Sequence, residues 1–109
     1  MATTNNTQKI SEMILNLESV TREAKHLGCT KWETYMEIIR MIDPVFTLLA
    51  EKLDNGDYDD FNADRKMSNC FLDLLDFFYD RRAENQPGTL EYNVVNSLYD
   101  IVHETYFGE

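Results

Sequence analysis

The sequence predicts an all-α fold, a compact bundle of four to five helices with no sheet. Apolar residues recur at spacings of three and four along most of the chain. The four glycines lie outside these periodic segments, and each proline lies between two of them or at the start of one, as expected for helix ends and turns. No segment alternates like a strand for long. The predicted helices span residues 8–27, 31–42, 44–54, 60–83 and 89–106.

The first predicted helix carries one apolar stripe at helical spacing. Its members are Ile10, Met13, Ile14, Leu17, Val20, Ala24 and Leu27. Gly28 follows the stripe and suits the left-handed conformation that ends many helices. Residues 1–7 are polar, so we expect a flexible N-terminal segment ahead of a single helical domain of residues 8–109.

The second periodic segment has a clear start and an ambiguous middle. Thr30 and Glu33 fit a capping box, in which each side chain satisfies the other residue's backbone amide. Asp43 precedes Pro44, and a residue before proline is biased away from helical torsions. We therefore favour a break here, with Asp43 capping a new helix over residues 44–54. A kink at Pro44 within one continuous helix is the alternative.

The second half of the chain predicts two long helices. The core stripe of the first consists of Met67, Cys70, Phe71, Leu74, Leu75 and Phe78. A turn at residues 86–88 follows, because proline and glycine suit its two central positions. Thr89 can cap the last helix, and Glu91 suits the positive N-terminal end of that helix.

The charge of the chain limits its partners. The net charge is −10, from 20 acidic and 10 basic residues. Residues 1–50 carry six acids and five bases, whereas residues 83–109 carry five acids and no lysine or arginine. DNA, RNA and anionic membranes would all repel such a chain. We therefore exclude direct binding to nucleic acid or membrane.

Two features indicate a cytoplasmic protein. No apolar run approaches the roughly 18–20 residues that span a bilayer. Cys29 and Cys70 are too few for a disulfide scaffold, which fits a reducing compartment.

A row of aspartates is the first candidate site. Asp73, Asp76 and Asp80 fall on one face of the helix over residues 60–83, at steps of about 4.5 and 6 Å along its axis. More carboxylates precede the row: Asp57, Asp59, Asp60 and Asp64. Carboxylates at such intervals can imitate successive phosphates and attract a protein with a basic nucleic-acid groove. The alternative is the ordinary solvated face of an amphipathic helix.

Three tyrosines of the last helix are the second candidate site. Tyr92, Tyr99 and Tyr106 recur every seven residues along one edge of a wide apolar arc. Tyrosine is enriched in protein interfaces, so the three could contact a partner helix or form a homodimer interface. Alternatively, they close the edge of the bundle's own core.

No complete metal-binding or cofactor-binding pattern occurs in the sequence. The aspartate-rich stretch at residues 54–64 lacks the ligand spacing of a calcium-binding EF-hand. His26 and His103 have no other histidine or cysteine at metal-ligand spacing. We expect no metal and no cofactor.

One pattern resembles half of an enzyme motif. Asp73-Leu74-Leu75-Asp76 is similar to the later ExxD motif of the small all-α nucleotide pyrophosphohydrolases. That resemblance implies magnesium held by carboxylates from two helices. The first residue is Asp instead of Glu, and Glu33 and Glu37 are four residues apart where the earlier ExxE motif has three. Such an enzyme is the least favoured alternative.

The sequence thus predicts a non-enzymatic inhibitor that occupies the basic nucleic-acid-binding surface of a target protein. Small acidic proteins of this kind are typical of phage counter-defence, which includes anti-CRISPR and anti-restriction proteins. The main alternative is a helical regulatory or structural subunit that acts through the tyrosine-lined helix.

Overall fold

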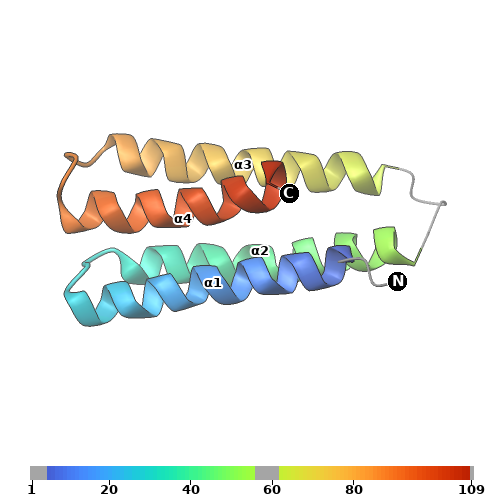
Figure 1. Ribbon diagram of the computed structural model, residues 1–109, viewed down its shortest axis with the longest axis horizontal. Helices are drawn as coiled ribbons and strands as arrows, with labels where there is room; N and C mark the ends of the chain where they lie inside the picture. Colours follow the sequence, from blue (N-terminus) through green and yellow to red (C-terminus); the bar gives the residue numbers. More distant parts are fainter. Residues whose placement is uncertain (1–4, 56–61, 109) are drawn as a thin grey trace.

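Four antiparallel helices form the protein in a computed structural model that describes residues 5–55 and 62–108 (Figure 1). Each helix packs against its neighbour in the chain, and the first packs against the last, so the four close into a bundle. The described residues contain no strand. The predicted all-α bundle is confirmed in its four-helix form. The helices are α1 (Asn6–Leu27), α2 (Trp32–Asp54), α3 (Ala63–Ala83) and α4 (Leu90–Phe107).

Side chains and a glycine define both ends of α1. The backbone N–H of Gln8 donates to Asn5 Oδ1 at 2.6 Å, so Asn5 is the N-cap and the helix begins two residues earlier than predicted. The N–H groups of Asn6 and Thr7 donate to the Asp54 carboxylate, at 2.8 and 2.7 Å, which links this end to the end of α2. Gly28 adopts the predicted left-handed conformation, with φ of 96°.

The break predicted at Pro44 is wrong, because α2 runs unbroken from Trp32 to Asp54. Pro44 is exposed, so its ring faces solvent and displaces nothing in the core. Asp43 caps no new helix; its side chain accepts a hydrogen bond from the Thr47 hydroxyl at 3.0 Å. Core packing on both sides of the proline holds the helix together. Buried residues of this helix are Tyr35, Met36, Ile39, Phe46, Leu49 and Ala50.

The predicted capping box is also wrong. Lys31 is the N-cap of α2 and makes no side-chain capping bond, while Thr30 binds the start of α4 instead. The cap of α4 is confirmed, because the N–H of Tyr92 donates to Thr89 Oγ1 at 3.2 Å. The turn before it is confirmed as well, with Gly88 at φ of 90°. The predicted start of the third helix at residue 60 lies outside the described residues.

The core lies along the bundle axis and draws on all four helices. Among the side chains with less than 2% exposure are Leu17 from α1, Phe46 from α2, Phe78 from α3 and Leu98 from α4. No helix in the described parts of the chain is long and apolar enough to cross a membrane. Because the core takes up the inward faces of the helices, the candidate sites lie on their outer surfaces.

Candidate protein-binding surface

The structure places Asp73, Asp76 and Asp80 on the outer side of α3, where all three are exposed. Residues between them, such as Leu74 and Phe78, point into the core. The ion pairs Arg22–Glu18 and Arg81–Glu84 do not involve these aspartates. We call the three residues the aspartate row.

The other predicted carboxylates do not join the aspartate row. Asp64 precedes Asp73 by nine residues, which is half a turn away at about 100° per residue. It lies instead beside a small cavity near Lys9 and Tyr106. Asp57, Asp59 and Asp60 lie outside the described residues.

An apolar groove between α2 and α3 borders the aspartate row. Its volume is about 310 Å³, and Asp73 belongs to its lining. The other lining residues are Ile38, Met41, Ile42, Val45, Phe46, Cys70, Leu74 and Phe77. The sequence analysis did not predict this groove, because a groove depends on how two helices pack against each other. The detectable signal was the second apolar edge of this helix, formed by Met41, Val45 and Leu48.

Two of the predicted tyrosines pack against the bundle. Tyr106 stacks on Phe71 with ring centroids 4.8 Å apart. The Arg82 guanidinium lies 4.6 Å from the centre of the Tyr99 ring. Tyr92, near the start of α4, is half-buried. All three tyrosines are partly buried, so part of each ring is not accessible to a partner. Their role in partner binding stays a prediction.

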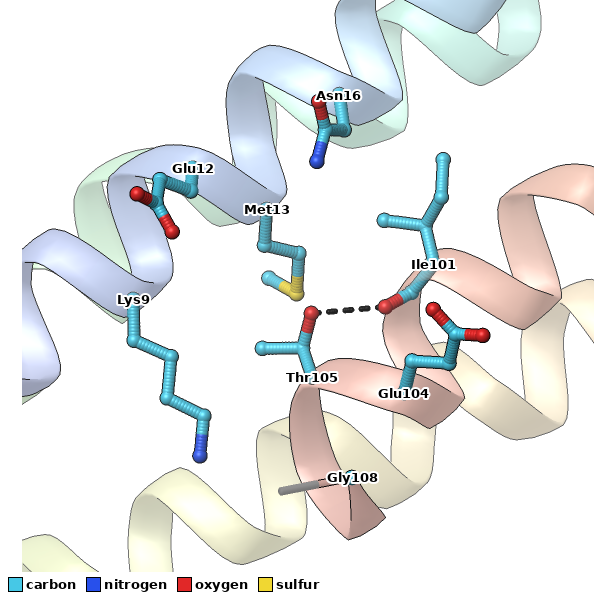
Figure 2. Close-up of a pocket in the computed structure, with 8 residues that line it drawn as sticks. All are labelled: Lys9, Glu12, Met13, Asn16, Ile101, Glu104, Thr105 and Gly108. Atoms are coloured by element: carbon cyan, nitrogen blue, oxygen red, sulfur yellow. Dashed lines mark hydrogen bonds between the residues drawn. The ribbon is translucent and has the colours of Figure 1, made fainter. Parts of the chain in front are cut away.

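A cavity of about 770 Å³ lies between α1 and α4 (Figure 2). Figure 2 shows Lys9 and Glu12 on the α1 wall and Glu104 on the α4 wall. The Thr105 hydroxyl donates to the Ile101 carbonyl at 2.8 Å, so the proton of this hydroxyl already has an acceptor. Neither histidine nor cysteine lines this cavity. The charged side chains of its lining are Lys9, Glu12 and Glu104.

The carboxylates of the enzyme-like pattern lie at the surface of the bundle. Glu33, Glu37, Asp73 and Asp76 are all exposed on the outside of α2 and α3. Within residues 5–55 and 62–108, no group of three or more His, Cys, Asp or Glu residues could hold a metal ion.

A hydrogen-bonded cluster of Cys29, Thr30 and Glu91 was not predicted. The Cys29 thiol donates to Glu91 Oε2 at 2.8 Å, and the N–H and hydroxyl of Thr30 donate to Glu91 Oε1 at 3.0 and 2.7 Å. Burial and the carboxylate together raise the pKa of Cys29 to about 11, so the thiol stays protonated at neutral pH. The cluster joins the α1–α2 loop to the start of α4. Cys29 and Glu91 are 62 positions apart in the sequence, so no local pattern predicts their contact.

Comparisons with models of known protein families, with curated proteins and with solved structures found no match. The fold and the surface define the class of protein: an acidic four-helix bundle whose α2 and α3 carry an apolar groove bordered by carboxylates.

Proposed function

We propose that this protein is a non-enzymatic inhibitor that occupies the basic nucleic-acid-binding surface of a target protein. The observation that carries the proposal is the aspartate row, three exposed carboxylates on one side of α3. Their steps along the helix axis, about 4.5 and 6 Å, approach the spacing of phosphates along a nucleic-acid strand.

Electrostatics favours a basic target. The net charge of −10 attracts a positively charged surface over a distance of about one Debye length, close to 8 Å at physiological salt. Asp76 and Asp80 are four residues apart on the helix, where like charges cost a few tenths of a kcal/mol. Lysine and arginine side chains of a partner would relieve that repulsion. The phage counter-defence proteins, anti-CRISPR and anti-restriction proteins among them, are the kind of inhibitor that this mechanism suits.

Affinity capture from a lysate of the native host, followed by competition with DNA, tests the proposal. We expect the captured protein to bind nucleic acid and to be released by added duplex DNA. Replacing Asp73, Asp76 and Asp80 together by asparagine should reduce capture at least about 10-fold, since each lost charge contact weakens the complex.

A matched control removes the same charge elsewhere. Replacing the exposed Glu12, Glu23 and Glu33 by glutamine changes the net charge equally but leaves the aspartate row intact. The control should capture the target almost as well as wild type. Equal capture by both triple variants, or a target that DNA does not displace, would contradict the proposal.

A further inference from the structure

We infer that the groove between α2 and α3 binds a basic amphipathic helix of the partner. The inference rests on the proposed function and names the structural element that the acidic surface recognises. It draws on the apolar lining of the groove and on the charge along its border.

The groove has the chemistry of a helix-binding site. On α2, Met41, Val45 and Leu48 have exposed fractions of 65%, 48% and 54%, so they form an uncovered apolar edge. The part of α2 that lines the groove, residues 38–46, rises by about 12 Å, which matches about two turns of a bound helix. On α3, Cys70 and Phe77 form the facing wall. Amphipathic helices place apolar side chains at spacings of three and four into grooves of this kind.

The charge along the groove selects a basic helix. Asp73 lines the groove itself, and Asp80 and Asp76 follow farther out on the same side of α3. On the opposite side, the exposed Glu37 lies one turn before Met41. Lysine or arginine on the flanks of a bound helix would therefore meet carboxylates from both walls.

In the described parts of the chain, neither the Arg22–Glu18 nor the Arg81–Glu84 ion pair involves the aspartate row. On α2, the exposed Arg40 stands next to Met41 and three residues after Glu37. Arg81 lies 5.2 Å from the Phe77 ring and pairs with Glu84 at 3.4 Å, beyond the end of the groove. Lys52 lies one turn after Leu48 on α2, and Lys66 lies one turn before Cys70 on α3. Each of these lysines has an interaction of its own.

A second copy of the chain fits the groove less well than a basic partner. Two copies joined through this face would bring the aspartate row of each close to the other. Each copy also carries a net charge of −10. The like charges would oppose the apolar contact, whereas a basic helix adds attraction to it.

Calorimetric titration with a synthetic peptide tests the inference. The probe is a peptide of about 16 leucine and lysine residues, arranged so that the leucines form one helical face. We expect it to bind the wild-type protein. Replacing Met41 and Val45 together by aspartate should weaken binding at least about 10-fold, because two apolar contacts are lost. Both positions are exposed, so the core remains intact, and circular dichroism checks the helix content.

The aspartate substitutions separate the groove from charge alone. They make the protein more negative, so a purely electrostatic complex with the peptide would become tighter. The matched control replaces Leu15 and Leu27 of α1, exposed by 60% and 61%, by aspartate and should leave affinity for the peptide undiminished.

Three results would overturn the inference. They are an undetectable complex with the wild-type protein, unchanged affinity in the Met41/Val45 variant, and equal binding of a peptide in which glutamate replaces lysine. The same variant in the capture experiment keeps this inference distinct from the proposed function. If capture needs the aspartate row but tolerates the Met41/Val45 changes, the groove inference fails and the inhibitor proposal stands.

Discussion

The carboxylate of Glu91 accepts three hydrogen bonds where the α1–α2 loop meets the start of α4. Burial alone would raise its pKa, but hydrogen bonds from Cys29 and Thr30 outweigh burial and hold the pKa below its ordinary value of 4.5. Because the pKa is lower in the folded state than in the unfolded state, the ionised Glu91 stabilises the fold at pH values above the ordinary pKa of 4.5. The contribution is lost as the pH falls through the folded-state pKa.

The pH dependence of stability follows from this residue. We expect Glu91→Gln to lower the free energy of unfolding at neutral pH by about 1–2 kcal/mol, because neutral hydrogen bonds replace charge-assisted ones. The difference from wild type should shrink below about pH 4, where the wild-type carboxylate also becomes neutral. Urea titration followed by the fluorescence of Trp32, which lies close by in sequence to Cys29 and Thr30, measures both values.

The exposed Glu104 supplies the control. Its side chain lies at the rim of the cavity between α1 and α4, so Glu104→Gln should change stability little at either pH. A loss in Glu91→Gln that persists unchanged at low pH would contradict an electrostatic role for Glu91.

At the scale of the helix, α2 shows how packing overrides a local signal. Pro44 has no N–H to donate to the Arg40 carbonyl, and its ring crowds the preceding turn. The apolar residues before and after it nevertheless share one buried face, with Ile39 and Phe46 both at 0% exposure. The helix therefore continues through Pro44 despite the missing hydrogen bond and the crowded turn.

This cost is measurable by substitution. We expect Pro44→Ala to raise the free energy of unfolding by about 1–3 kcal/mol, because alanine restores the hydrogen bond to Arg40 and has the highest helix propensity. Chemical denaturation gives the value. Thr34→Ala, exposed on the same helix, is the control and should gain only a few tenths of a kcal/mol. A Pro44→Ala protein less stable than wild type would show that α2 depends on the proline for its geometry.

At the scale of the whole molecule, the sequence predicted the features that depend on nearby residues, which are the apolar stripes and the helix caps. The stripe from Ile10 to Ala24 and the caps at Gly28 and Thr89 depend on residues a few positions apart, and these predictions are confirmed. The last member of the predicted stripe is wrong, because Leu27 is 61% exposed at the end of α1. The capping box failed because Glu91, distant in sequence, takes the hydrogen bonds of Thr30.

The same distinction applies to the candidate site: one part was predicted from local spacing and the other part was not. Helical spacing alone predicts that Asp73, Asp76 and Asp80 share one face, and all three are exposed. The groove beside them depends on how α2 packs against α3, and no spacing within one helix encodes that contact. The surface is therefore visible only once both helices are in place.

The salt dependence of the complex with the captured target tests the central claim most directly. We expect the affinity to fall steeply as salt is raised, because exposed carboxylates contacting lysine and arginine are screened. Replacing the aspartate row by asparagine should flatten that dependence, whereas the Glu12/Glu23/Glu33 control should keep most of it. An affinity indifferent to salt, or an equally steep dependence without the aspartate row, would contradict the account.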